Sequence, residues 1–357
     1  MDSVLNCIKQ TDLLGIKMAK TGILLINLGS PSDLSKSAIR TYLNEFLNDP
    51  RVIDINPLGR KALVNLIILP FRPRKTIKAY EKIWTKEGSP LILNTKAICE
   101  KLSKVLGGSF QLDFAMRYGE PKLSDALAKF KDCDSLILVP LYPHYATSST
   151  GSTLAKVSEI FSKQWDVPNF RSIHSFYNHP GFIGPTAEKI KSASSDFDWD
   201  HILFSYHGIP ERHIEKSSCK HILDPCKSKP CPDKIERPQY CYRYQCYQTS
   251  KLVAEKIGLK ESEYSTSFQS RLGRTPWIKP YTDLYVEDLY KKGVRKLMVT
   301  CPSFIADCLE TTDEVGNELR EQWLGYEGTT FKFIPCLNDD DAWIEGLKEI
   351  ILEHLKS

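Results

Sequence analysis

Short apolar runs recur along the whole chain, and most of them end at a glycine, a proline or a histidine. Runs of this length, rich in β-branched residues and bounded by turn residues, are typical of strands buried on both faces. Segments with apolar residues at helical spacing lie between them. The predicted strands are 21–28, 110–118, 135–142, 171–177, 202–207, 264–269, 295–301 and 330–335.

Strands and helices alternate over the full length, which predicts an α/β fold with parallel, doubly wound sheets. The two halves share one layout and predict two similar Rossmann-like lobes around a cleft. We expect an N-terminal extension at 1–20, a first lobe at 21–180 completed by a C-terminal helix at 341–357, and a second lobe at 181–340. No Gly-x-Gly-x-x-Gly pattern follows the first strand, which disfavours a dinucleotide enzyme.

Composition narrows the classes of function. The chain has 357 residues, 41% of them apolar, and a net charge of +4, too small to indicate a nucleic-acid partner. No window reaches the roughly 18 apolar residues that a spanning helix needs. A helix expected at 60–84 is broken at Pro70 and Pro73. Its apolar part, Ala62 to Phe71, precedes basic residues, and we expect a buried helix end there rather than contact with a membrane surface.

The N-terminal residues 1–20 carry scattered charges and lack the long apolar core of a secretory signal. We therefore expect a cytoplasmic, reducing location, with at most peripheral contact with the inner membrane.

The stretch from Ile202 to Pro210 is a short apolar strand that runs into His207, followed at once by Gly208 and Pro210. In open α/β sheets, ligands bind beyond the carboxyl ends of the strands. His207 is therefore expected at the mouth of the cleft, on a rigid support. The alternative is a histidine that merely packs in a loop.

A second feature follows the predicted strand 295–301. Asp307, Glu310, Glu314 and Glu318 are spaced by three, four and four residues, which places them on one face of a helix expected at 307–323. Such a row is either a solvated face or a path of oxygen ligands and proton acceptors. A histidine opposite these carboxylates suits delivery of a metal together with removal of protons.

Several long motifs, in this order along the chain, resemble the signature of the ferrochelatases, which insert ferrous iron into a porphyrin to make haem. The matching stretches cover the chain from about Thr21 onward, apart from a cysteine-rich insert. They are Asn27 to Pro31, Gly88 to Leu91, Met116 to Tyr118, Tyr142 to Tyr145, Phe204 to Pro210, Thr266 to Trp277 and Cys301 to Thr311.

The resemblance implies roles for individual residues. It makes His207 and Glu310 the opposed catalytic pair that binds Fe²⁺ and takes the pyrrole protons, and Asp307 and Glu314 extend the carboxylate side. A neutral imidazole and a carboxylate serve both needs. The residues implied around the macrocycle are Leu28, Arg117, Tyr118, Tyr142, Gln269, Trp277 and Phe304. One departure is Cys308, where some members carry a histidine.

Five of the eleven cysteines fall in the insert at 214–246. They are Cys219, Cys226, Cys231, Cys241 and Cys246. Disulfides are disfavoured in a cytosolic chain, and a zinc site more often shows paired Cys-x2-Cys spacing. A [2Fe–2S] cluster tolerates irregular spacing. Some ferrochelatases carry such a cluster on an internal segment, and the resemblance implies Cys219, Cys226, Cys231 and Cys241 as ligands, with Cys246 in reserve.

The sequence thus predicts a chelatase that inserts Fe²⁺ into protoporphyrin IX to form protohaem, the final step of haem biosynthesis. Alternatives are a chelatase for coproporphyrin or for cobalt, and a non-catalytic haem or iron sensor in the same cleft. The His207 and Glu310 pair counts against the sensor. The expected partners are a porphyrin and ferrous iron, without nucleic acid, and the oligomeric state is left open.

Overall fold

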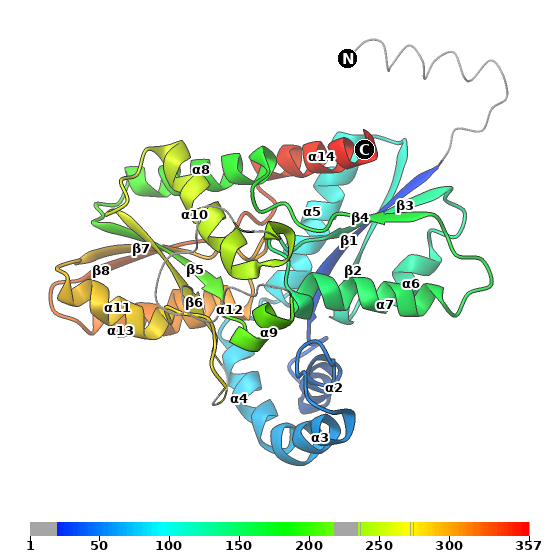
Figure 1. Ribbon diagram of the computed structural model, residues 1–357, viewed down its shortest axis with the longest axis horizontal. Coiled ribbons are helices and arrows are strands. Elements are labelled where there is room, and N and C mark those ends of the chain that lie inside the picture. The colour runs from blue at the N-terminus through cyan, green and yellow to red at the C-terminus, as the bar shows by residue number, and fades with distance from the viewer. Residues whose placement is uncertain (1–19, 218–234, 236, 272, 274, 357) are drawn as a thin grey trace, which may run out of the picture.

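The computed structural model describes residues 20–217, 235, 237–271, 273 and 275–356 (Figure 1). Its first sheet has four parallel strands in the order β2-β1-β3-β4. The strands are β1 (Thr21–Ser30), β2 (Phe110–Gly119), β3 (Ser135–Pro140) and β4 (Phe170–Ser172). β1 is central and almost wholly buried, as its continuous apolar sequence predicts.

The second sheet repeats the pattern of the first, with four parallel strands in the order β6-β5-β7-β8. Its strands are β5 (His201–His207), β6 (Tyr264–Gln269), β7 (Lys296–Thr300) and β8 (Thr330–Ile334). β5 pairs with β6 up to His207 but with β7 only up to Phe204. The predicted α/β fold with two similar, parallel, doubly wound lobes is confirmed.

Helices cover both sheets. In the first half they are α2 (Lys36–Leu47), α3 (Pro57–Ala62), η2 (Leu63–Ile68), α4 (Leu69–Glu81), α5 (Pro90–Leu106), α6 (Leu123–Ala128), η3 (Thr147–Gly151) and α7 (Ser152–Phe161). In the second half they are α8 (Pro180–Ser195), α9 (Glu211–Lys216), η5 (Pro238–Tyr240), α10 (Tyr242–Ile257), α11 (Thr282–Lys291), α12 (Leu309–Thr312), η6 (Glu314–Leu319), α13 (Arg320–Leu324) and α14 (Asp341–Lys356).

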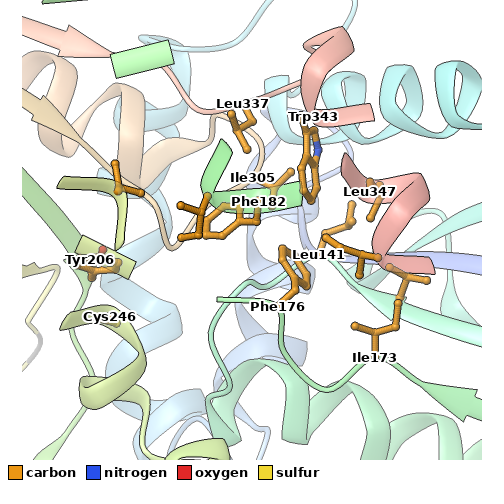
Figure 2. Packing of buried hydrophobic residues seen from close by; sticks show 14 of the residues in the cluster. Leu141, Ile173, Phe176, Phe182, Tyr206, Cys246, Ile305, Leu337, Trp343 and Leu347 are labelled. Atoms are coloured by element: carbon orange, nitrogen blue, oxygen red, sulfur yellow. The ribbon is translucent and has the colours of Figure 1, made fainter. Parts of the chain in front are cut away.

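The two lobes share one hydrophobic core. Buried residues of both sheets, such as Leu25 and Phe204, belong to the same cluster, together with rings of α8 and α14. Figure 2 shows Phe176, Phe182 and Trp343 packed against each other in this core, with ring centroids 5.6–6.2 Å apart. α14 also contacts α5 of the first lobe, so it joins the two halves.

Two predicted elements differ in the structure. The helix expected at 60–84 is not broken at its prolines, since α3, η2 and α4 follow one another without a gap from residue 57 to 81. The π-helical turn η2 shifts the hydrogen-bond ladder just before Pro70 and Pro73, where amide donors are missing. The strand expected at 171–177 is only the three residues of β4. Beyond it, the ring of His174 stacks on Tyr145 at 4.2 Å.

The segment from α3 to α4, residues 57–81, is here called the arm, and it projects from the body beside α2 (Figure 1). The buried helix end predicted at 62–71 is wrong for much of this stretch. Leu66 is 73% exposed, Ile67 60% and Phe71 77%, and Leu58 just before them is 81% exposed. Val64 and Leu69 are buried in the small core formed with α2, and Ile68 packs against it.

Within the described part of the chain, no helix is long and apolar enough to cross a membrane.

Candidate active site

His207 is the last residue of β5, at the carboxyl edge of the second sheet. Its Nδ1 lies 2.6 Å from the carbonyl oxygen of Gly208. A carbonyl can only accept, so Nδ1 carries a hydrogen and donates it, and Nε2 is the nitrogen that can offer a lone pair. The backbone is also held, because the His207 N–H donates to Ser303 Oγ at 3.0 Å and Tyr242 Oη donates to the His207 carbonyl at 2.8 Å. The imidazole is thus held in one orientation, with Nε2 as the ring nitrogen not used in this bond.

Two of the predicted ring-binding residues lie beside this imidazole. The ring of Trp277 lies 6.4 Å from His207, and the ring of Phe304 lies 6.2 Å away, centroid to centroid. Trp277 is positioned by the antiparallel bridge between its backbone and Pro210. All three side chains are partly exposed, so they form an aromatic surface around the histidine that suits a flat apolar ligand.

Glu310 lies in α12, on the connection that follows β7. Gln269 is opposite His207 in the register of β5 and β6, and its Nε2 donates to the Glu310 carbonyl at 2.8 Å. Gln269 therefore ties the segment that carries the glutamate to the strand end that carries the histidine. Tyr80 of α4, in the first lobe, lies near this glutamate: burial first, and then the charge of Glu310, raise the pKa of Tyr80.

Glu314 begins the π-helical turn η6, and its carboxylate accepts a hydrogen bond from Ser270 Oγ. Burial, and next the nearby charge of Glu310, raise the pKa of Glu314 from 4.5 to about 7. A carboxyl group with such a pKa gains and loses a proton readily at neutral pH. Glu314 is therefore suited to accept protons that leave Glu310.

Asp307 has a different environment from the two glutamates. Its Oδ1 accepts from Thr311 Oγ1 at 3.0 Å and from the Cys336 N–H at 3.1 Å. Its Oδ2 accepts from Asn338 Nδ2 at 2.7 Å. These bonds hold the loop before α12 against the segment after β8, so the geometry favours a positioning role for Asp307, and its role as an iron ligand stays a prediction.

The regular helix predicted at 307–323 is wrong in detail. Asp307 precedes α12, and the π-helical turn η6 separates α12 from α13. The Glu318 N–H bonds the fifth residue back, Asp313, at 2.8 Å, so the turn is wider than an α-helical one. In this turn Asp313 is buried and pairs with Lys82, the residue after the arm, at 2.9 Å, whereas Glu318 is exposed. Glu310 and Glu314 are both partly buried.

Arg117 and Tyr118 end β2 in the first lobe and belong to a hydrogen-bonded group that we call the Asp49 network: Asp49, Arg117, Tyr118 and Ser152. Asp49 Oδ2 accepts from Arg117 Nη2 and from Ser152 Oγ, both at 2.5 Å, and from Tyr118 Oη at 2.9 Å. Tyr118 is fully buried. Their contact with the macrocycle stays a prediction, and the geometry favours support of the cleft wall.

A shallow depression of about 540 Å³ adjoins the Asp49 network. The residues that line it include Asn44, Glu45, Lys61, Asn65, Lys156 and Glu159. These charged and amide side chains offer a flat ring no aromatic surface to stack on, so this depression does not suit a porphyrin.

Leu28 and Tyr142 are the remaining predicted wall residues. Leu28 packs in the cluster that also holds Tyr80 and Leu309, the residue before Glu310. Leu28 therefore lies on the glutamate side of the site. Tyr142 follows β3 and is buried, and burial raises its pKa above the usual range.

Of the five cysteines in the insert, Cys219, Cys226 and Cys231 lie outside the described residues. Cys241 is buried at the N-terminus of α10, and Cys246 is fully buried one turn later in the shared core. Among the described residues, no group of three or more His, Cys, Asp or Glu side chains is arranged to hold a metal ion.

Several positions that shape the site were missed at the level of sequence. Ser303, Ser270 and Tyr80 each contact or lie close to a predicted site residue. Ser270 and Ser303 fall inside the recognised motifs, and Ser270 has a φ of 66°, which is uncommon outside glycine. Tyr80 and Tyr242 come from helices with no signal of their own, so only the fold reveals them.

Two lobes with parallel sheets, an oriented histidine, and carboxylates on a facing segment define a chelatase of the two-lobed α/β class. Solved structures agree on the fold. The structure titled "SirB from Bacillus subtilis with Fe3+" matches with a TM-score of 0.54 over 95% of this chain and 98% of that chain, at 11% identity. A second SirB structure, from Bacillus subtilis subspecies spizizenii in complex with cobalt, matches with a TM-score of 0.53, at 9% identity over 94% and 96% of the two chains.

Sequence comparison gives the family. The ferrochelatase family model matches residues 20–355. A ferrochelatase of Legionella pneumophila (strain Corby) is 44% identical over 94% of this chain and 100% of its own length. One of Coxiella burnetii (strain RSA 493 / Nine Mile phase I) is 43% identical over 98% and 99%. The chain belongs to the ferrochelatase family and inserts ferrous iron into a porphyrin in haem biosynthesis, which confirms the activity predicted from the motifs.

Proposed function

We propose that the chain forms protohaem from protoporphyrin IX, the final step of the pathway, with His207 and Glu310 on opposite faces of the ring. The observation that carries this proposal is the Nδ1–H bond from His207 to Gly208, because it leaves the Nε2 lone pair for the reaction. In this proposal His207 Nε2 coordinates the incoming Fe²⁺, since imidazole is a good ligand for this borderline metal.

The carboxylate side removes the protons. The porphyrin loses two pyrrole protons as four iron–nitrogen bonds form, and iron stays ferrous throughout. Glu310 accepts the two protons from the ring one after the other, and Glu314, with its pKa of about 7, takes each onward before the next one leaves. Asp307 is left out of this relay because both of its oxygens already accept hydrogen bonds.

The character of the wall supports protoporphyrin over coproporphyrin. Leu28, Trp277 and Phe304 are apolar or aromatic, and the first two lie on different sides of the site. Protoporphyrin has vinyl groups where coproporphyrin has two additional propionates. Burying those carboxylates against apolar walls without partners is unfavourable.

The test is an anaerobic assay that follows the loss of porphyrin fluorescence and the growth of haem absorbance. We expect multiple turnovers with Fe²⁺ and protoporphyrin, a lower kcat/KM with coproporphyrin, and no turnover in His207→Ala. His179→Ala, at the start of α8, is the matched control and keeps wild-type turnover. Turnover in His207→Ala would remove His207 from the reaction, and a preference for coproporphyrin would overturn the choice of ring.

We also propose that the insert holds a [2Fe–2S] cluster through Cys219, Cys226, Cys231 and Cys241. Cys241 suits this role, because it lies at the N-terminus of α10, where the helix dipole stabilises a thiolate. Cys246 suits it less, because it lies one turn further into the helix and is fully buried in the shared core. The cluster supplies electron-transfer chemistry when bound, and no step of metal insertion needs it.

The cluster is tested by visible absorption of anaerobically purified protein. Cys231→Ser and Cys241→Ser should each remove the cluster absorption, whereas Cys246→Ala should keep it. A colourless wild-type protein with no bound iron or sulfide would exclude the cluster. If Cys246→Ala alone lost its colour, Cys246 would replace Cys241 as the fourth ligand.

Peripheral membrane contact is the third proposal, with the arm as the contact surface. Leu58, Leu66, Ile67 and Phe71 project from it, and the exposed Lys61, Arg74 and Lys75 lie among them. Apolar side chains ringed by basic ones suit the surface of an anionic bilayer. We expect a cytoplasmic protein that docks there, near the source of its apolar substrate.

Co-sedimentation with phosphatidylglycerol-containing vesicles tests this docking. The double variant Leu66→Asp, Phe71→Asp should lose binding. Trp165→Asp, which changes a 98% exposed tryptophan outside the arm, should keep it. Equal binding by all three proteins would exclude the arm as the contact surface.

A further inference from the structure

The peptide groups of His207 lie where the second sheet loses one of its strands. β5 pairs with β6 as far as His207, whereas its pairing with β7 stops at Phe204. Backbone groups beyond that point need other partners, since an unpaired buried N–H or C=O is strongly unfavourable. Two hydroxyl groups take the place of the missing strand: Ser303 Oγ accepts from the His207 N–H, and Tyr242 Oη donates to the His207 C=O.

These two hydroxyls come from different elements. Ser303 lies in the loop between β7 and α12, the connection that leads to Glu310. Tyr242 is the first residue of α10, is buried, and packs its ring edge-on against His144 at 6.0 Å. The strand end is therefore fixed by side chains whose positions depend on the glutamate loop on one side and on the start of α10 on the other.

We infer that Tyr242 and Ser303 are positioning residues, whose hydroxyl groups hold the His207 peptide so that Nε2 faces the incoming metal. The inference rests on the proposed role of His207. Nδ1 is bonded to the carbonyl of the adjacent residue, Gly208, so the ring follows the local backbone. A change in the peptide plane of His207 rotates the imidazole with it. Small displacements of a reacting group can reduce rates by large factors.

The test uses Tyr242→Phe and Ser303→Ala, which each remove one hydroxyl. We expect kcat/KM for Fe²⁺ to fall about tenfold in Tyr242→Phe and about threefold in Ser303→Ala, because the ligand is less well oriented. The KM for the porphyrin should stay within about twofold, since the aromatic surface is unchanged. Co²⁺ titration without porphyrin, followed by absorption, should show weaker metal binding in both variants.

Tyr206→Phe is the matched control. Tyr206 is another buried tyrosine of the same core, and its hydroxyl makes a 2.8 Å bond to Ser250 rather than to His207. It should lose thermal stability to about the same extent as Tyr242→Phe but keep the wild-type KM for Fe²⁺. A purely structural role for Tyr242 would give the two variants the same kinetics.

The outcomes separate this inference from the proposed function. Turnover in wild type, none in His207→Ala, and wild-type metal binding and kcat/KM in both Tyr242→Phe and Ser303→Ala would overturn the inference and leave the proposed function intact. Turnover in His207→Ala would instead overturn the proposed role of His207. If Tyr242→Phe fails to fold, Ser303→Ala still decides, because it leaves α10 untouched.

Discussion

The carboxyl ends of the two sheets occupy equivalent places in the two lobes, yet their chemistry is opposite. At the end of the first sheet, the polar groups of Arg117 and Tyr118 form hydrogen bonds with Asp49 and Ser152. At the end of the second, His207 keeps a basic nitrogen and Glu314 has a pKa near neutrality. A strand end in this fold is therefore a place where a reactive group can face a ligand. Whether the group stays reactive depends on the hydrogen bonds that its neighbours make with it.

Two histidines extend this comparison. His207 donates from Nδ1 and presents Nε2. His144, just after β3, makes its bond through Nε2 to Thr249 Oγ1 at 2.8 Å. The Thr249 hydroxyl donates to the Tyr177 carbonyl at 2.7 Å, so it accepts from His144, which carries its hydrogen on Nε2. His144 is fully buried among aromatic rings, so its basic nitrogen faces protein rather than ligand.

The largest effect is expected at Glu310. Glu310→Gln keeps the shape of the side chain and the backbone carbonyl that accepts from Gln269, but it removes the proton acceptor. General-base groups typically contribute 10²–10⁴-fold, so kcat should fall by about that factor. Anaerobic steady-state kinetics with Fe²⁺ and protoporphyrin measure it.

The free energy of unfolding of Glu310→Gln should stay within about 1 kcal/mol of wild type, as for most substitutions that leave packing intact. A variant that unfolds easily but, once folded, turns over normally would show that Glu310 supports the fold, as the Asp49 network does, and is not a proton acceptor.

The next effect is expected in the first lobe and affects stability. Asp49→Ala leaves the nearly buried Arg117 guanidinium without its carboxylate. Breaking a buried pair by removing one partner typically costs 3–5 kcal/mol, so urea unfolding should show a loss of about that size. Asp113→Ala is the control, because its pair with Lys129 lies at the surface and should cost about 1 kcal/mol or less. Equal losses would show that the Asp49 network does not stabilise the fold.

The fold could be predicted closely from sequence because apolar strand runs and helical spacing are local signals. Both sheets and their parallel pairing follow from the alternation of the two. The misses are places where tertiary packing overrides the local pattern. The π-helical turns η2 and η6 are examples, because Pro70 and Pro73 read as breaks and Asp307 to Glu318 read as one regular face.

The site was predictable only as a set of positions. Motifs brought His207, Trp277, Phe304 and Glu310 into consideration, and the structure places the first three together. Sequence could not show that Asp307 is saturated with hydrogen bonds or that Glu314 is not, because their partners Asn338 and Ser270 are distant in sequence. Spacing finds candidate groups, and long-range contacts decide their protonation and availability.

The pH dependence of stability tests the difference between a titratable group in the site, Glu314, and groups outside it. The folded state holds a proton on Glu314 up to a pKa of about 7, whereas the unfolded chain releases it near 4.5. Glu314 therefore destabilises the folded state increasingly as pH rises from 4.5 to 7. At about 1.4 kcal/mol per pKa unit, the upper limit is roughly 3 kcal/mol.

Glu314→Gln removes this charge, so the variant should be more stable than wild type at pH 8 by about 1–3 kcal/mol, with no advantage near pH 4.5. Glu159→Gln is the control, since Lys163 and Lys156 lower the pKa of Glu159 to about 2, and no gain is expected at pH 8. A constant difference between Glu314→Gln and wild type at all pH values would exclude titration of this carboxyl group.

The smallest effect has the opposite sign and belongs to His144. Burial lowers its pKa from 6.5 to about 3. Below pH 6.5 the unfolded chain binds a proton at this histidine and the folded chain does not, so stability falls as pH drops from 6.5 towards 3. At pH 5 the loss is about 2 kcal/mol.

His144→Gln tests this effect. The variant retains a donor for Thr249 and cannot titrate, so its stability, measured by equilibrium urea unfolding, should change less between pH 7 and pH 5 than that of wild type. His201→Gln provides the comparison, because burial lowers the pKa of His201 to about 4 in a region outside the cleft. An unchanged slope in His144→Gln would show that the proton is taken up elsewhere and that His144 is not the buried, non-titrating counterpart of His207.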